Sequence, residues 1–224
     1  SEIYGINNIE KLINIFKDDK DFLKAYIILK NSINNSENIC ILGDYDVDGA
    51  CATSLLVRYF THINQKHFFY IPNRTEDGYG ASVKLFQKLI LKKPKLIIMV
   101  DCGSTSIEAI DYLNKHNIKS IVIDHHEINK PHPKSNAIIN PKKQSKKKES
   151  SLLCATALTY FFLEILIKKT KSNFKLSNFL IYVLLATICD VMPLRKINRI
   201  IALNIIDNFN IQNLVALNYI FNQY

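Results

Sequence analysis

The sequence has little glycine: six residues in 224, and none after Gly103. The C-terminal half therefore contains no glycine-rich loop that could cradle a phosphate group. Five cysteines are present, an odd number, and no two have the C-x-x-C spacing of a zinc knuckle. We therefore expect reduced, largely buried thiols, as in a cytoplasmic protein.

Long apolar runs are also missing. No stretch reaches the roughly 18 uninterrupted apolar residues that a membrane span needs, and the N-terminus lacks the basic-then-apolar pattern of a signal peptide. We therefore expect no contact with a membrane. The chain begins with Ser1 and not with Met, so we expect it to be a piece of a longer protein. It contains neither a nucleophile elbow with Ser or Cys nor a G-x-x-x-x-G-K-S/T phosphate loop.

Basic residues outnumber acidic ones, with 29 Lys and Arg against 20 Asp and Glu and a net charge of +9. This excess favours an anionic partner such as nucleic acid. The composition is also rich in Lys, Asn and Ile, as AT-biased coding would give, which weakens the argument. Residues 142–148 hold five lysines. We interpret them first as a solvated loop and, as the alternative, as a nucleic-acid patch.

The most informative stretch is residues 39–49, in which a short apolar run is followed by Asp44, Asp46, Asp48 and Gly49. Three like charges at alternate positions repel one another, and a divalent cation among them would relieve the repulsion. The alternative is a solvated acidic turn, which is the commoner structure for Asp and Gly. This stretch by itself does not decide between the two.

Apolar periodicity predicts strands alternating with helices over the first 141 residues. The predicted strands are residues 39–42, 68–71, 96–100, 121–123 and 137–139. The predicted helices are residues 9–33 with a break at Asp18-Asp19, 49–60, 82–91, a helix ending near His116, 152–168, 176–189, 198–209 and 214–221. We divide the chain into an α/β core (1–141), a lysine-rich loop (142–150) and a helical part (151–224).

Several polar residues directly follow predicted strands: Asp44 and Asp46, then Asp101, then Asp124 and His125. Strands joined by helical crossovers run parallel, and their carboxyl ends meet at one edge of the sheet. These side chains are therefore expected to form one site.

Carboxylates with one or two imidazoles suit Mn²⁺ well and Mg²⁺ less well. With Asp190, which ends a predicted helix, there are enough carboxylates for two ions about 4 Å apart. The other histidines lack acidic neighbours and are expected to be ordinary ones: His62, His67, His116 and His132.

At these residues the chain resembles the DHH phosphoesterase superfamily and, within it, the RecJ family of exonucleases. The motifs that carry the resemblance are Gly43-Asp44-Tyr45-Asp46-Val47-Asp48-Gly49, Pro72-Asn73-Arg74, Asp77-Gly78-Tyr79-Gly80, Val100-Asp101-Cys102-Gly103, Asp124-His125-His126, Ile138-Ile139-Asn140-Pro141 and Asp190-Val191-Met192-Pro193-Leu194. They occur in the family's order over nearly the whole chain.

The resemblance implies a mainly parallel five-stranded sheet flanked by helices, followed by a helical C-terminal part, and two Mn²⁺ or Mg²⁺ ions. Asp46, Asp101, His125 and Asp190 would hold one ion. Asp44 and a bridging Asp101 would hold the other, and His126 would lie near the scissile phosphate. Four residues are assigned supporting roles: Arg74, Asp124, Gly103, and Asp48 as the cap of a helix that starts at Gly49.

The implied activity is a metal-dependent 5′→3′ exonuclease that releases 5′-mononucleotides from single-stranded DNA in recombination and repair. Single-stranded DNA is the implied partner, with a single-strand-binding protein or a helicase as candidate protein partners. Two alternatives stay open: a DHH phosphodiesterase acting on oligoribonucleotides or cyclic dinucleotides, and a non-catalytic scaffold module.

The chain also departs from the family pattern. Leu42 stands where some RecJ proteins have histidine, which predicts a weaker second metal site. The family's glycine-rich nucleic-acid-binding domain is not visible after Gly103, so we expect the catalytic core alone.

Overall fold

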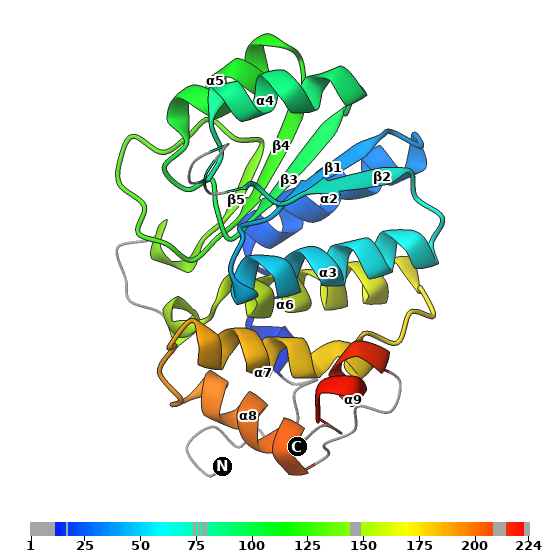
Figure 1. Ribbon diagram of the computed structural model, residues 1–224, viewed down its shortest axis with the longest axis vertical. Helices are drawn as coiled ribbons and strands as arrows, with labels where there is room; N and C mark the ends of the chain where they lie inside the picture. The colour runs from blue at the N-terminus through cyan, green and yellow to red at the C-terminus, as the bar shows by residue number, and fades with distance from the viewer. Residues whose placement is uncertain are drawn as a thin grey trace.

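A single parallel sheet forms the centre of the computed structural model, which describes residues 12–16, 18–73, 75, 77, 80–143, 149–207 and 214–221. The strands are β1 (Ile39–Leu42), β2 (His67–Tyr70), β3 (Leu96–Val100), β4 (Lys119–Ile123) and β5 (Ala137–Ile139). Their order is β2-β1-β3-β4-β5, and every neighbouring pair is parallel (Figure 1). The predicted α/β class and five-stranded sheet are therefore confirmed.

Helices cover both faces of this sheet, which explains why β1 and β3 are continuously apolar. Successive side chains of a strand point to opposite faces. Ile39 and Ile41 accordingly join the apolar cluster on one face, whereas Cys40 and Leu42 join the cluster on the other. The first face carries α2 (Lys20–Asn34), α3 (Val47–His62) and α6 (Ala155–Thr170), and the second carries α4 (Val83–Leu89) and α5 (Ile107–Lys115) (Figure 1).

The C-terminal part adds further helices below α3 and α6. They are α7 (Leu180–Cys189), α8 (Ile197–Asp207) and α9 (Val215–Phe221). Short 3₁₀ turns are η1 (Ile13–Ile15), η2 (Ile90–Lys92), η3 (Pro141–Lys143), η4 (Glu149–Leu152) and η5 (Leu176–Phe179). Helix α6 is buried along almost its whole length. The sheet and α3 pack against it on one side, and α7 packs against it on the other. One apolar cluster thus runs from the sheet to α8.

Several predicted helix starts differ from the structure. Helix α6 begins at Ala155 and not at residue 152, and α7 begins at Leu180, after η5, and not at residue 176. The predicted break at Asp18-Asp19 is the beginning of α2: Asp19 is its N-cap and accepts a hydrogen bond from the Asp21 N–H at 2.9 Å. Residues 1–11 and 17 lie outside the described part of the chain. Helix α3 begins at Val47, before the predicted start at Gly49.

The capping residue of α3 was assigned wrongly. Asp46, not Asp48, is the N-cap, because its carboxylate accepts a hydrogen bond from the Gly49 N–H at 2.9 Å, three residues on. Asp48 therefore lies inside the first turn of α3, where its side chain faces other elements.

Most of the lysine-rich run, residues 144–148, lies outside the described residues. Lys142 and Lys143 are described and make ion pairs with Glu127 at 3.0 Å and Asp21 at 2.6 Å. The division of the chain at residues 141 and 151 stays a prediction. Among the described residues, no helix has the length and apolar character required to cross a membrane.

Candidate metal centre

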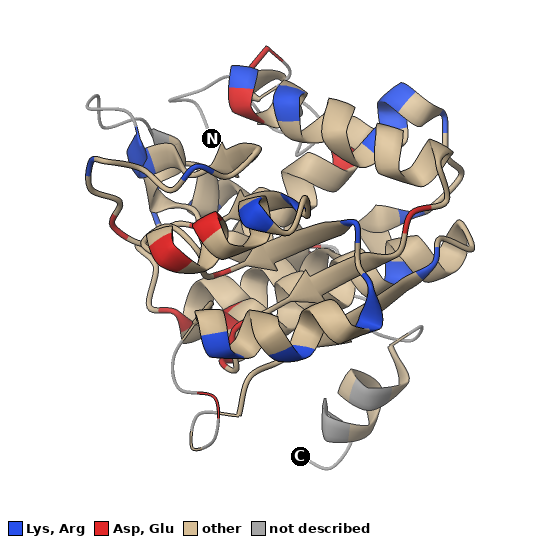
Figure 2. Cartoon of the chain, turned by 90° about the horizontal axis from the view of Figure 1, so that it is seen from above, with Lys and Arg blue, Asp and Glu red and all other residues tan. Residues whose placement is uncertain are grey.

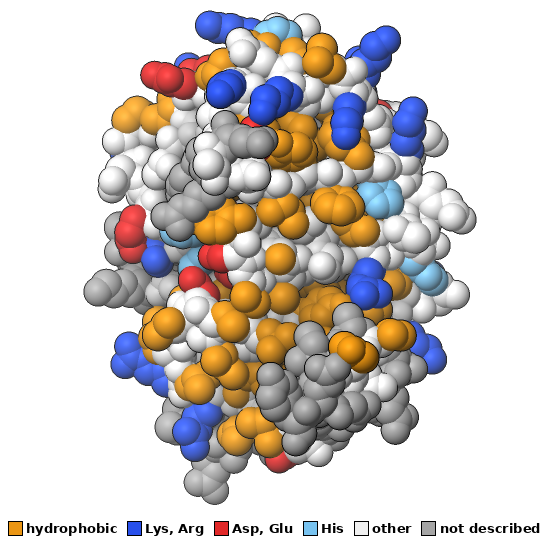
Figure 3. All heavy atoms as spheres, in the orientation of Figure 1, with side chains coloured by type: hydrophobic (Ala, Val, Ile, Leu, Met, Phe, Trp, Pro, Cys, Tyr) orange, Lys and Arg blue, Asp and Glu red, His pale blue; other side chains and the backbone are white. Residues whose placement is uncertain are grey.

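The carboxyl ends of β1, β3 and β4 bring acidic and histidine side chains together, as the strand order predicts. Asp44 follows β1, Asp101 follows β3, and His125 follows β4. Asp190, the C-cap of α7, approaches the same place from the helical part. Figure 3 shows acidic and histidine side chains side by side near the level at which α3 begins, with hydrophobic side chains around them.

Three groups of side chains place their ligand atoms within 4.8 Å of one another. They are Asp44 with Asp46 and Asp101, Asp101 with His125 and His126, and Asp48 with His125 and Asp190. Asp101 and His125 each belong to two groups, so neighbouring groups share ligands. Shared ligands of this kind are compatible with a pair of adjacent cations.

The grouping differs from the predicted one at two carboxylates. Asp46 lies with Asp44 and Asp101, and not with Asp190. Asp48 occupies the place beside Asp190 and His125. The difference follows from the helix start, because capping turns Asp46 back toward the first turn of α3. The individual roles of these ligands stay predictions.

His125 lies among three carboxylates. Its Nε2 atom is 3.3 Å from Asp101 Oδ1, 3.4 Å from Asp190 Oδ2 and 3.6 Å from Asp48 Oδ2. Both ring nitrogens of His125 and both carboxylate oxygens of Asp101 are buried, yet none has a hydrogen-bond partner among the described residues. Buried polar atoms are rarely left unpaired. A divalent cation would satisfy these atoms, so the donor set fits a metal.

The electrostatics of the cluster agree with this fit. Burial and the neighbouring carboxylates of Asp48 and Asp46 raise the pKa of Asp101 far above its usual range. Burial also raises the pKa of Asp190; Asp48 and Asp46 add to the effect, and His125 opposes it. Without a cation the ionised forms of both carboxyl groups are therefore disfavoured, and a bound metal would favour them.

The backbone adopts two positive φ angles directly after β3. Asp101 has a φ of 61°, in the left-handed region that non-glycine residues seldom adopt. Gly103 follows with a φ of 106°, and a Cβ there would lie 3.1 Å from Met99 Sδ and 3.2 Å from Val122 Cγ2. Glycine is therefore needed at residue 103 for this turn to hold Asp101 at the site.

Gly49 permits a second close approach. A Cβ at this position would lie 2.5 Å from the backbone N and O atoms of Asp44. The first turn of α3 thus packs directly on the backbone that carries Asp44, which fixes the spacing between the end of β1 and the helix.

The first turn of α3 is also joined to α6. Asp48 accepts hydrogen bonds from the N–H groups of Ala155 and Thr156, each at 2.7 Å. Asp48 thus serves the N-terminus of α6, whose N-cap residue Cys154 makes no side-chain capping bond. Sequence reasoning missed this contact because the partners are more than 100 residues apart.

His126 is held by a buried network. Its Nδ1 atom lies 2.8 Å from Asp124 Oδ1, and Asp124 Oδ2 accepts the Ser104 N–H at 3.0 Å. Asn140 donates to the Ser104 hydroxyl at 2.8 Å and to the His126 carbonyl at 2.9 Å. Burial opposes ionisation of Asp124, but hydrogen bonds from His126 and Ser104 lower its pKa below the usual range. The hydrogen bond with Asp124 raises the pKa of His126.

The loop after β2 is fixed at Asp77. This buried carboxylate accepts hydrogen bonds from the Tyr70 hydroxyl at 2.6 Å, from Lys88 Nζ at 2.6 Å and from the Asn73 N–H at 3.1 Å. Arg74, which was predicted to support the site, lies outside the described residues.

Two other features do not take part in the cluster. Leu42 packs in the apolar cluster beneath α4 and α5. Its effect on metal binding stays a prediction.

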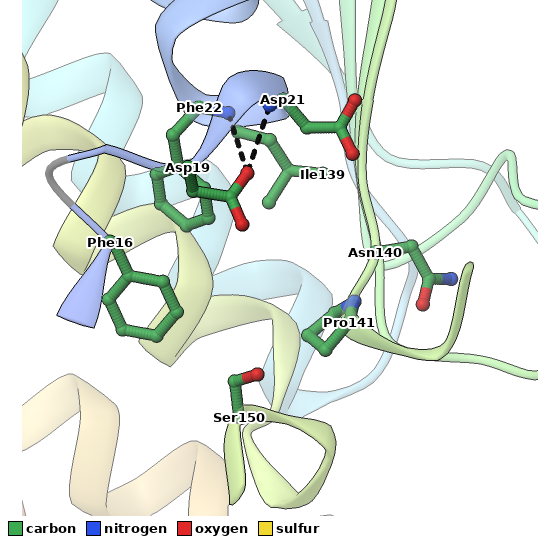
Figure 4. Close-up of a pocket in the computed structure, with 8 residues that line it drawn as sticks. All are labelled: Phe16, Asp19, Asp21, Phe22, Ile139, Asn140, Pro141 and Ser150. Carbon is green, nitrogen blue, oxygen red and sulfur yellow. Dashed lines mark hydrogen bonds between the residues drawn. The ribbon is translucent and has the colours of Figure 1, made fainter. Parts of the chain in front are cut away.

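A small cavity between the start of α2 and the end of β5 has a volume of about 20 Å³ (Figure 4). That volume is room for about one water molecule.

Comparison with known proteins identifies the chain's relatives. A family model described as "DHH family, N-terminal domain" matches residues 38–188. The single-stranded-DNA-specific exonuclease RecJ of Haemophilus influenzae is 32% identical over 190 residues, covering 80% of this chain and 33% of that protein. The RecJ of Bacillus subtilis is 29% identical over 174 residues, covering 78% of this chain and 22% of that protein.

A solved structure shares the fold. The crystal structure of exonuclease RecJ bound to manganese superimposes with a TM-score of 0.74 at 27% identity, covering 81% of this chain and 46% of that one. The chain spans a third or less of the length of these two curated relatives. The family match covers well over half of the chain, and the fold and the cluster of acidic and histidine residues agree with it: this chain belongs to the DHH family and carries its N-terminal domain.

Proposed function

We propose that this chain is the catalytic core of a metal-dependent exonuclease that degrades single-stranded DNA from its 5′ end and releases 5′-mononucleotides. The observation that supports this most strongly is the buried carboxylate of Asp101, which has no hydrogen-bond partner among the described residues and belongs to two potential ligand groups. The curated relatives named as single-stranded-DNA-specific exonucleases support the choice of substrate.

Mn²⁺ or Mg²⁺ would be held by side chains of all three groups: Asp44, Asp46, Asp48, Asp101, His125 and Asp190. When bound, a pair of such ions lowers the pKa of a water ligand and stabilises charge on the departing oxygen. The left-handed backbone at Asp101 and the packing of Gly49 on Asp44 hold two of these carboxylates before any cation arrives, so little rearrangement is needed.

His126 acts on the phosphate side of the site. Its ring is 43% exposed, unlike that of His125, and its Nδ1 atom is fixed by Asp124. Because the pKa of His126 is raised, more of it is protonated near neutral pH. The imidazolium neutralises a non-bridging phosphate oxygen while water adds to phosphorus and the bond to the 3′-oxygen breaks.

The test is hydrolysis of a 5′-labelled single-stranded oligonucleotide with and without Mn²⁺. The proposal expects mononucleotide release from the 5′ end that EDTA abolishes and Asp101→Asn or His125→Ala reduces by at least about a hundredfold. Exposed Glu108, at the start of α5, gives the control Glu108→Gln, which should retain activity. Unchanged hydrolysis in the Asp101 variant would refute the proposal.

A substrate panel separates the open alternatives. Faster turnover of di- and oligoribonucleotides or cyclic dinucleotides than of single-stranded DNA would favour the other phosphodiesterase activity. No hydrolysis together with no Mn²⁺-dependent rise in melting temperature would favour the scaffold module.

We further propose that the protein acts in the cytoplasm, where its five free cysteines stay reduced. We propose that it acts there in recombination and repair, together with a single-strand-binding protein or a helicase.

A further inference from the structure

An open groove of about 590 Å³ runs beside α3 on the side of the edge strand β2. Ser54, Arg58 and Thr61 of α3 line it at helical spacing. Phe69 and Ile71, from β2 and the residue that follows it, line it as well. These two residues are 53% and 37% exposed because, among the described residues, no strand pairs with the outer side of β2. Figure 3 shows hydrophobic side chains along this part of the surface.

The side chain of Arg58 contacts two aromatic rings at this groove. Its guanidinium carbon lies 4.9 Å from the centroid of the Phe179 ring and 5.8 Å from that of the Tyr182 ring. One of its terminal nitrogens also donates to the Tyr182 hydroxyl at 3.2 Å. The groove therefore offers a planar cation backed by aromatic rings together with a separate exposed ring, that of Phe69.

The charge of the groove suits an anionic ligand with flat apolar parts. Among its described lining residues, Arg58 is cationic and none is acidic. The Lys and Arg positions of the described chain are spread over several helices, strands and loops (Figure 2). Proteins bind unpaired nucleobases by stacking them on aromatic rings and on the guanidinium planes of arginine. Ser and Thr hydroxyl groups donate hydrogen bonds to phosphate oxygens.

Helix α3 connects the metal centre to the groove. Asp46 and Asp48 lie at the start of α3, and Ala50, in the first turn of the same helix, already lines the groove. From residue 46 to residue 61 the helix rises about 22 Å, which is room for several nucleotides of an extended strand. A strand with one phosphate at the metal centre can therefore continue along α3.

We propose that this groove binds the nucleotides of single-stranded DNA that adjoin the one held at the metal centre, with bases stacking on Phe69 and on the Arg58 guanidinium. The substrate class rests on the proposed exonuclease function. The groove itself is built within the DHH domain and needs no other domain of the longer relatives. An apolar peptide is the competing occupant.

Binding of fluorescein-labelled oligothymidylates by the full chain in EDTA tests this proposal without hydrolysis. Fluorescence anisotropy would be measured for lengths from about two to about twelve nucleotides. The affinity of the parent should rise with length, and Phe69→Ala and Arg58→Gln should each weaken binding of the longer strands about fivefold or more. The matched controls are Leu91→Ala, a residue 78% exposed on η2, and Arg199→Gln, an exposed residue of α8; both should bind like the parent.

A second readout separates the groove from the chemistry. With Mn²⁺, the ratio of activity on a long oligonucleotide to activity on bis(p-nitrophenyl) phosphate should fall in both groove variants and stay constant in both controls. Parent-like affinity and length dependence in both groove variants would overturn the proposal, as expected if the groove docks a peptide. A further outcome is that the parent hydrolyses neither substrate while the two groove variants still bind the longer strands more weakly than the two controls do. That result would support the groove and contradict the proposed nuclease function.

Discussion

Thr156 donates two hydrogen bonds to Asp48, one to its side chain and one to its backbone. The Thr156 N–H donates to a carboxylate oxygen of Asp48 at 2.7 Å, and the Thr156 hydroxyl donates to the Asp48 backbone carbonyl at 2.8 Å. The same carboxylate lies 3.6 Å from His125 Nε2. The start of α6 is thus fixed to the first turn of α3 at the metal centre, and the stability of the helical part is linked to the geometry of the site.

Asp48→Ala should weaken both folding and metal binding. It leaves the buried N–H groups of Ala155 and Thr156 without acceptors, which costs about 2 kcal/mol or more of unfolding free energy with Mn²⁺ present. The rise in melting temperature on adding Mn²⁺ should shrink as well. Asp19→Ala, which removes the cap of α2 away from the site, should cost about 1 kcal/mol and leave the Mn²⁺ response intact. Equal Mn²⁺ responses in the two variants would contradict the linkage.

Asp101→Asn should stabilise the metal-free protein. Burial and the charges of Asp48 and Asp46 disfavour the ionised Asp101, so near neutral pH this carboxyl group must take up a proton on folding, a cost that the amide removes. We expect a gain on the order of 1 kcal/mol near neutral pH, measured by urea unfolding in EDTA. With excess Mn²⁺ the order should reverse, because the variant lacks the shared ligand. A variant less stable than the parent in EDTA would argue against a repulsive, metal-free cluster.

Asn140→Ala should lower activity through His126. The amide of Asn140 joins the Ser104 hydroxyl to the His126 carbonyl, so its loss frees the loop that carries the imidazole. We expect a loss of about ten- to a hundredfold in kcat with a smaller change in KM. Asn136→Ala is the matched control, because Asn136 accepts a hydrogen bond from Ser120 at the opposite end of the same strands. Comparable losses in both variants would indicate general destabilisation of the sheet.

Asp77→Asn should remove an acid-dependent part of the stability. Hydrogen bonds from Lys88 and Tyr70 lower the pKa of Asp77 to about 2, from 3.8. A lowered pKa in the folded state means that this stabilisation is complete above about pH 4 and is lost as the pH falls through 2. The difference in melting temperature between parent and variant should therefore be constant from pH 6 to about 4 and should shrink below that. A constant difference down to pH 2 would show that Asp77 does not act through its charge.

Local sequence patterns were sufficient for the framework of the fold. Residues 39–42, 96–100 and 137–139 form strands with the predicted bounds, because short continuous apolar runs between turn residues have few other structures open to them. The order of strands and helices predicted parallel pairing, and parallel pairing placed Asp44, Asp101 and His125 at one edge. The sequence by itself thus determined the fold class and the position of the site.

The tertiary structure decided how the individual side chains are used. Asp46 and Asp48 carry the same charge two residues apart, and whether Asp46 caps α3 depends on where the helix begins. Asp48 is directed to α6 by amides at residues 155 and 156, and Asn140 meets Ser104 only after β3, β4 and β5 have paired. The groove beside α3 likewise arises where β2 is left at the edge of the sheet. Such contacts join residues far apart in the chain, so no local pattern records them.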